Sequence, residues 1–372
     1  MSPESASARV PAETLRAQLR LIFRAWGMAA DQLEPTVQVM VETDLWGVDS
    51  HGISMLMMYD RHRRMGKLNF RAKPRVLRET AVMALIDADA GLGHAVSVTA
   101  MNLAVDKCQA EGVGVVSVVN SHHFGAAGVY ANIAADRGAV GLVTSSTQGV
   151  LVVPTYGAEP VLGTNPLAFA APARRHPPFL LDMATSTVAG NKLKVYAFHG
   201  KPLPQGWIVD RNGAPLTDAA EARRILDVPT GGGLTPLGAT PELGSHKGYG
   251  LAVMVHILGG TLAGGSFSPI RKRTQKPEDP DNIGHFFLAV DPKAFRPDGE
   301  FEEDLDQLID VLHATRPADP ARPVLVAGDP EFATREERLR DGVPIPEELM
   351  RHVEEIATAA GVEFLLRAPA GA

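Results

Sequence analysis

A serine and a histidine lie together between Asp49 and Gly52, and this short segment is the first that could do chemistry. A histidine titrates near neutral pH, so His51 can give or take a proton under working conditions. The Ser50 hydroxyl beside it could relay or orient that proton, and Gly52 lets backbone and substrate come close. The segment also fits a capped turn between two helices. Alone, it indicates acid/base chemistry without identifying a reaction.

Three further segments have small or glycine-rich residues where a helix is predicted to start, and a fourth is a polar turn. Free backbone N–H groups at a helix start, together with the helix dipole, favour an anion such as a pyrophosphate. A lysine among glycines also suits phosphate. Ordinary capped turns or loops explain each segment equally well when taken alone. Together with His51, they suit a phosphate-bearing cofactor and a proton-coupled reaction. The segments are 120–128, 182–186, 244–250 and the turn 163–166.

The common fingerprints of nucleotide and metal enzymes do not occur in the sequence. No G-x-G-x-x-G lies between a strand and a helix, and P-loop, H-E-x-x-H, EF-hand and G-x-S-x-G patterns are missing. His122 and His123 are adjacent, but neighbouring side chains in a strand point apart, so we predict no metal site. Rossmann, P-loop and zinc-hydrolase folds are therefore disfavoured.

The elements that must position these residues can be read from hydrophobic periodicity, which predicts helices at both chain ends around a central α/β body. Runs of β-branched and apolar residues predict strands at 113–119, 140–144, 167–170, 179–181 and 286–290. Helical spacing predicts helices near 15–23, 33–41, 93–111, 126–137, 187–198, 251–262, 304–312 and 346–358. The charged, proline-containing stretch 271–281 predicts an exposed loop.

Composition limits the function classes. The chain has 372 residues, of which 45% are apolar and 21% charged, so we expect a sizeable packed core. A net charge of −7 argues against a nucleic-acid partner. A single cysteine, Cys108, excludes an internal disulfide and a thiolate metal site, which favours a reducing compartment. Without a signal pattern or an apolar run of about 18 residues, we expect a cytoplasmic protein with no membrane partner.

Six motifs follow one another in an order typical of one family. They are Asp-Leu-Trp-Gly-Val-Asp-Ser-His-Gly at 44–52, His-Phe-Gly at 123–125, Leu-Gly-Thr-Asn-Pro at 162–166, Leu-Asp-Met-Ala-Thr-Ser at 181–186, Lys-Gly-Tyr-Gly at 247–250 and Asn-Ile-Gly-His-Phe-Phe at 282–287. From about residue 13 to 360, the chain resembles the non-Rossmann malate/L-lactate dehydrogenase family. That family includes ureidoglycolate and sulfolactate dehydrogenases, diketogulonate reductases and cyclic-imine carboxylate reductases.

The resemblance implies a homodimeric oxidoreductase that uses NAD or NADP. It implies an α/β (α+β) fold, in which a non-Rossmann nicotinamide-binding domain has a mixed, largely antiparallel sheet and a helical domain comes from both chain ends. The expected parts are an N-terminal helical part at 1–75, a central cofactor-binding domain at 76–290, and a C-terminal helical part at 291–372 that packs with 1–75.

The resemblance also implies roles for individual residues. His51 would donate the proton to the carbonyl oxygen in reduction with support from Ser50, and Lys192 would polarise the carbonyl or hold His51 in position. Thr164 and Asn165 would contact the substrate. The residues expected to bind the cofactor are His123, Phe124, Gly125, Ala126, Ala127, Asp182, Met183, Ala184, Thr185, Ser186, His246, Lys247, Gly328 and Asp329.

Some positions bear on the substrate. The imine-reducing branch tends to carry an aspartate where this chain has Lys192, which favours hydroxy acid chemistry. Many members have an arginine that clamps a substrate carboxylate where this chain has Met55, an arginine at Trp46 and a glutamate at His256. We predict an enzyme that interconverts a 2-oxo acid and a 2-hydroxy acid. Two alternatives stay open: a cyclic imine carboxylate reductase and a catalytically silent dinucleotide-binding protein.

Overall fold

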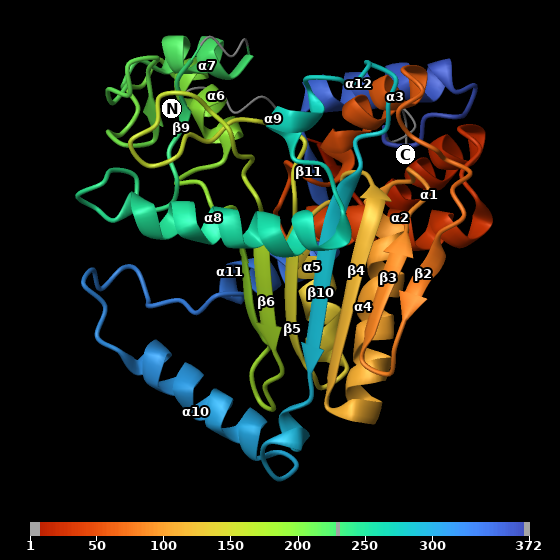
Figure 1. Cartoon of the computed structure of the whole chain (residues 1–372), viewed down its shortest axis with the longest axis vertical. Coiled ribbons are helices and arrows are strands. Elements are labelled where there is room, and N and C mark those ends of the chain that lie inside the picture. Colours follow the sequence, from red (N-terminus) through yellow and green to blue (C-terminus); the bar gives the residue numbers. More distant parts are fainter. Residues whose placement is uncertain (1–7, 228–230, 368–372) are drawn as a thin grey trace.

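A seven-stranded sheet forms the centre of the protein, for which the computed structural model describes residues 8–227 and 231–367 (Figure 1). Its strands are β2 (Arg75–Glu79), β3 (Met83–Asp87), β4 (Val113–Ser121), β5 (Val140–Ser145), β6 (Leu167–Ala171), β7 (Phe179–Met183) and β10 (Ile283–Val290). They lie in the order β2-β3-β4-β10-β5-β6-β7. Within this sheet β3 and β4 run parallel, and the other neighbouring pairs are antiparallel. The predicted mixed, largely antiparallel sheet is confirmed.

The parallel connection passes through helix α4 (Gly93–Glu111), which packs directly on β4. This helix ends at Gly112, whose φ of 83° suits a glycine at a helix C-terminus. A Cβ on Gly114 would lie 1.8 Å from the Ala104 carbonyl oxygen, so the contact between helix and strand requires a glycine there. Behind it, β4 is rich in valine, which favours a buried strand.

Helices cover the sheet and build the rest of the molecule. They are α1 (Ala12–Ala25), α2 (Ala30–Leu45), α3 (Leu56–Arg64), α5 (Ala127–Asp136), α6 (Gly190–Phe198), α7 (Ala219–Asp227), α8 (Ser245–Gly259), α9 (Ser268–Arg271), α10 (Glu300–Ala314), α11 (Asp329–Asp341) and α12 (Glu347–Ala359). The predicted helix 187–198 is shorter than expected. Thr187 N–H donates to the Thr235 carbonyl, and Ala189 is extended, so α6 begins only at Gly190.

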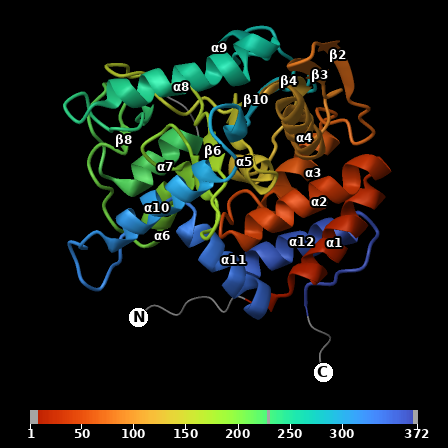
Figure 2. The same cartoon turned by 90° about the horizontal axis from the view of Figure 1, so that it is seen from below.

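The two chain ends pack into one helical part, as predicted. Strand β1 (Ala8–Val10) pairs antiparallel with β11 (Val343–Ile345), and α12 lies beside α1 (Figure 2). Their apolar side chains share a core in which Leu15, Phe23 and Val353 are fully buried. Helix α10 lies elsewhere: its buried Asp306 accepts backbone N–H groups of residues 174–176, in the loop between β6 and β7.

A smaller apolar core lies in the stretch that contains α6, α7 and the short strands β8 (Ile208–Val209) and β9 (Gly233–Leu234). Helix α8 contributes to this core through Ala252 and also contacts β5 and β10, so it joins the smaller core to the sheet. Among the helices of residues 8–227 and 231–367, none has the combined length and hydrophobicity needed to cross a bilayer.

Candidate active site

The turn that carries His51 follows α2 and is built around the side chain of Asp44. Asp44 Oδ2 accepts the Ile53 N–H at 2.8 Å, on the far side of the turn. A Cβ on Gly52 would lie 1.8 Å from Asp44 Oδ1, so only glycine fits between them. Burial raises the pKa of Asp44 to about 8, and the Ile53 N–H opposes this shift. The carboxyl group is therefore mostly protonated at neutral pH and carries little charge inside the turn.

Arg338, near the C-terminal end of the chain, holds the His51 turn through hydrogen bonds. Arg338 of α11 is 9% exposed, and its guanidinium donates to both carboxylate oxygens of Asp49 and to the Asp44 carbonyl. A two-pronged guanidinium–carboxylate pair fixes distance and orientation together. The helical part made from both chain ends thus positions the residues next to His51. The sequence indicated no role for Arg338, because 289 residues separate it from Asp49.

His51 is half-buried and sits between a hydroxyl and a second imidazole. Its Nδ1 lies 2.8 Å from Ser50 Oγ, so the two predicted residues are within hydrogen-bond distance. Its ring stacks on His123, with 5.5 Å between ring centroids and 28° between planes. Burial lowers the pKa of His51, so the imidazole is mainly neutral at neutral pH. A neutral imidazole that keeps some exposure can accept a proton and return it to solvent.

His123 is held in one tautomer by Tyr59 of α3. The Tyr59 hydroxyl lies 2.7 Å from His123 Nδ1, and Gly125 N–H also points to this nitrogen, at 3.3 Å. Because Nδ1 accepts, we assign the ring proton to Nε2. Burial, with neighbouring histidines, lowers the pKa of His123 well below its usual value. His123 therefore offers a neutral N–H donor. Tyr59 and His94, whose Nε2 lies 3.4 Å from the same hydroxyl, had not been predicted as site residues.

The predicted cofactor segments 123–127 and 182–186 lie next to each other. Asp182 Oδ2 accepts the Gly128 N–H at 2.7 Å, so the end of β7 meets the first turn of α5. Burial raises the pKa of Asp182 to about 6, although the Gly128 N–H opposes the shift. This carboxylate thus holds the 123–127 turn in place. Phe124 is buried there and stacks on His285, with 4.4 Å between ring centroids.

The predicted substrate residues are tied to the same segment. Thr185 Oγ1 donates to the Thr164 carbonyl at 3.0 Å. Asn165 is 1% exposed, and its side-chain amide donates to the Ala252 carbonyl at 2.9 Å and accepts from Thr147 at 3.1 Å. The Asn165 side-chain amide thus links the 163–166 turn to α8.

Two predicted pairs lie further out. His246 and Lys247 are exposed on the first turn of α8, which connects to the 182–186 segment through Leu237 N–H and the Thr185 carbonyl. Gly328, with a φ of 106°, and Asp329 begin α11, where Ala327 accepts the Leu180 N–H of β7. Met183 is the last residue of β7, and Ala184 and Ser186 follow it in the chain. With the small residues Ala126 and Ala127 they complete the predicted set.

Lys192 is exposed on α6, and its ammonium lies 5.9 Å from the centre of the Trp207 ring. Within residues 8–227 and 231–367, no hydrogen bond or ion pair joins Lys192 to the His51 turn. A role of Lys192 at the reacting carbonyl stays a prediction.

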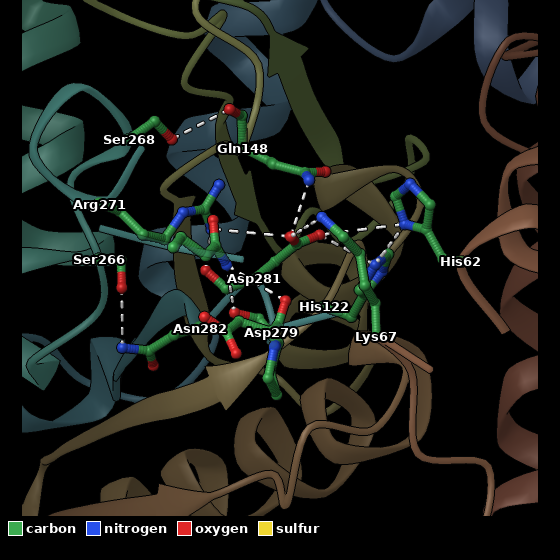
Figure 3. A network of polar contacts seen from close by, with 12 residues as sticks. His62, Lys67, His122, Gln148, Ser266, Ser268, Arg271, Asp279, Asp281 and Asn282 are labelled. Atoms are coloured by element: carbon green, nitrogen blue, oxygen red, sulfur yellow. Dashed lines mark hydrogen bonds and ion pairs between the residues drawn. The ribbon is translucent and has the colours of Figure 1, made fainter. Parts of the chain in front are cut away.

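His122 points away from His123, as expected, and enters a second polar cluster with His62 and Asp281 (Figure 3). Its Nε2 lies 2.8 Å from His62 Nδ1 and 3.1 Å from Asp281 Oδ2, separations short enough for a shared metal ion. However, His122 Nδ1 accepts the His123 N–H at 2.8 Å, so the ring proton must occupy Nε2. A nitrogen that carries a proton has no lone pair for a metal, so the cluster fits a hydrogen-bonded network better.

The chain belongs to the malate/L-lactate dehydrogenase family, whose model matches residues 10–354. Solved structures of similar dehydrogenases share its fold. A malate dehydrogenase of Pyrococcus horikoshii is 40% identical over 358 residues, covering 96% of this chain and 97% of that one. A solved structure of malate dehydrogenase from Pyrococcus horikoshii has a TM-score of 0.85 at 38% identity, over 96% of this chain and 97% of that chain.

Two other similar proteins are named for different activities. A malate/(S)-sulfolactate dehydrogenase of Methanothermus fervidus is 32% identical over 352 residues, covering 95% of this chain and 98% of that one. The structure of a delta1-piperideine-2-carboxylate reductase from Pseudomonas syringae has a TM-score of 0.81 at 28% identity, covering 94% of this chain and 100% of that chain. The family is therefore settled, while its members act on different substrates.

Proposed function

We propose that the protein is an NAD(P)-dependent oxidoreductase that interconverts a 2-oxo acid and a 2-hydroxy acid. The observation that carries the proposal is the environment of His51: a half-buried, neutral imidazole bonded to Ser50 and stacked on His123. Relatives named for malate and sulfolactate oxidation support the same substrate class. The alternative of a silent dinucleotide-binding protein does not account for this acid/base group.

The residues expected to hold the nicotinamide cofactor fit such a group. The exposed His246 imidazole and the exposed cation Lys247 stand on the first turn of α8, where the helix dipole also favours a phosphate. Small residues at 125–127 leave room for close approach. When bound, the nicotinamide supplies or accepts the hydride. Parallel assays with NADH and NADPH measure which of the two cofactors the enzyme uses.

The chain's own residues handle the proton. In oxidation, neutral His51 accepts the hydroxyl proton of the 2-hydroxy acid, while Ser50 holds its Nδ1. In reduction, protonated His51 returns the proton to the carbonyl oxygen. His123 presents its Nε2–H beside His51, which suits a hydrogen bond to a substrate oxygen. Lys192 and Thr164 are proposed to act as the resemblance implies.

The test is His51→Ala, followed by NADH or NADPH absorbance with a panel of 2-oxo acids. General acid/base catalysis contributes about 10²- to 10⁴-fold, so kcat should fall by that factor while NADH binding, measured by fluorescence, persists. His352→Ala is the matched control, because His352 lies on the surface of α12. Turnover of His51→Ala within a few-fold of wild type would exclude His51 as the acid.

A second candidate function is reduction of a cyclic imine carboxylate. It is favoured by the likeness to the piperideine carboxylate reductase structure. Activity on a ring imine with none on open-chain 2-oxo acids would establish it. The same substrate panel separates the two candidates directly.

The homodimer and the cytoplasmic location are further proposals. Helix α10 exposes Leu308, Val311 and Leu312, at 51%, 68% and 39%, which supports burial against a second copy. Light scattering on the purified protein should give twice the chain mass of 39.6 kDa. Cell fractionation tests the location.

A further inference from the structure

A surplus of positive charge is buried around Asp281, between α9 and the loop that follows α3. Lys67 and Arg271 point at this carboxylate, and their side chains are 10% and 9% exposed (Figure 3). Burial lowers the pKa of the adjoining Lys272, and the nearby Arg271 and Lys67 lower it further. Two buried cations thus share one carboxylate, with a third cation at their edge.

Neither cation makes a close ion pair with that carboxylate. Gln148 occupies Asp281 Oδ1 with a hydrogen bond of 2.7 Å. Lys67 Nζ lies 3.4 Å from the same oxygen, and Arg271 Nη1 lies 3.8 Å from it. Charge-assisted N–H···O bonds are normally about 2.7–2.9 Å long. The carboxylate therefore satisfies neither partner fully.

Hydrogen-bond donors are left over as well. Arg271 Nε is buried and has no hydrogen-bond partner in the described chain, although Nη1 donates to the Asp281 carbonyl. Lys67 has three N–H groups and makes one long bond. Asp279, the nearest other acid in the loop, accepts the Lys276 N–H of its own turn. Buried donors are rarely left unpaired, which points to an additional acceptor.

Arg271 also forms part of the wall of a cavity of about 800 Å³. The other walls are mainly apolar, including Val253 and Ile257 of α8 and Phe267, with Ser266 as a polar neighbour. This is the size and character of a site for a small organic molecule. An acid entering it would meet a cation without having to displace a close ion pair.

We propose that Arg271 and Lys67 form an oxyanion-binding site that takes the distal acid group, a carboxylate or sulfonate, of a 2-oxo acid substrate. The inference rests on the proposed function. The cluster connects to the reacting centre through His122, whereas His51 stacks on the next residue, His123. It is thus displaced from the proton donor, which suits the acid group at the far end of the substrate and not the carboxylate next to the carbonyl carbon. Met55, close to His51 in sequence, has no charge to offer.

The 2′-phosphate of NADP offers the same oxyanion chemistry as the acid group of the substrate. The experiment therefore varies the acid substrate and the cofactor. Arg271→Gln is assayed with oxaloacetate, sulfopyruvate and pyruvate, each with NADH and NADPH. Loss of a charge-assisted bond should raise KM for the two diacids about 10- to 100-fold with either cofactor. KM for pyruvate should stay within about threefold, and Arg271→Lys should recover part of the loss. Arg273→Gln, at an exposed neighbouring arginine, is the control.

Three results would overturn the assignment. They are an equal rise in KM for pyruvate, no rise for any acid, and a rise confined to NADPH, which would give the site to the cofactor phosphate. Thermal stabilisation by malonate separates this inference from the proposed function. If the enzyme reduces no 2-oxo acid but malonate still stabilises wild type and not Arg271→Gln, the proposed function fails and the oxyanion site stands. If 2-oxo acids are reduced but malonate stabilises both chains equally, the oxyanion site fails.

Discussion

Removing one oxygen atom, in Tyr59→Phe, tests how the site fixes its histidines. The hydroxyl is fully buried and lies 2.7 Å from His123 Nδ1 and 3.4 Å from His94 Nε2. Without it, His123 Nδ1 keeps the Gly125 N–H, whereas the His94 N–H loses its acceptor. One lost hydrogen bond and one unpaired buried donor together cost about 2–3 kcal/mol of unfolding free energy.

The catalytic effect should be smaller than the effect on stability. Tyr59 supplies one of two donors that hold the proton of His123 on Nε2. Losing about 1 kcal/mol of the preference for the Nε2-protonated tautomer of His123 reduces the population of that tautomer. As a result, kcat/KM should fall about fivefold. Chemical denaturation measures the first effect, steady-state kinetics the second, and ¹⁵N chemical shifts the tautomer itself.

Tyr156→Phe is the matched control, because Tyr156 is 90% exposed and its hydroxyl should contribute nothing measurable. If Tyr59→Phe unfolds within about 0.5 kcal/mol of wild type and the His123 nitrogen shifts do not move, the hydrogen-bonded chain does not determine the tautomer.

Further predictions concern the turn and its proton. Arg338→Gln should lower kcat with little change in cofactor affinity, because the turn at Asp49 loses its guanidinium; equal loss of both would contradict a positioning role. Gly52→Ala should destabilise by at least about 1–3 kcal/mol in thermal unfolding, since its Cβ would overlap Asp44. The pKa of Asp44 is about 8 in the folded chain, whereas in the unfolded chain this carboxyl group ionises near pH 4. The free energy of unfolding of the wild type should therefore fall as pH rises from about 4 to 8. Asp44→Asn should lack this decline. Oxidation needs neutral His51, whose pKa is lowered, so kcat/KM should fall only below about pH 6.5; a midpoint above that value would contradict this assignment.

The central sheet was largely predictable, because its strands are uniform apolar runs. Strands β4 to β7 and β10 lie within a few residues of the predicted positions. Strands β2 and β3 were missed. All five residues of β2 are exposed, and its sequence, Arg-Val-Leu-Arg-Glu, has no clean alternation of apolar and polar residues. Its strand conformation comes from pairing with β3, which no local pattern records.

Helix α11 is a helix that no local sequence pattern predicts. Its sequence is dominated by charges and has no apolar stripe, so periodicity gave no signal. In the structure, it is held by specific pairs, such as Arg335 with Glu42 and Arg338 with Asp49. Likewise, His51 was found because its neighbours form a motif. Tyr59 was missed because its function depends on His123, which lies 64 residues away.

Electrostatics explains why one histidine among many is suited to transfer a proton. Burial lowers the pKa of His94 and His285 to about 3 and that of His62 to about 4, and it lowers the pKa of His123 well below its usual value. These four imidazoles stay neutral at working pH and serve as fixed donors and acceptors. His51 is only half-buried, and burial is the sole cause that lowers its pKa. A protonated His51 therefore faces neutral imidazoles, so its charge would not be repelled in the proton transfer proposed above.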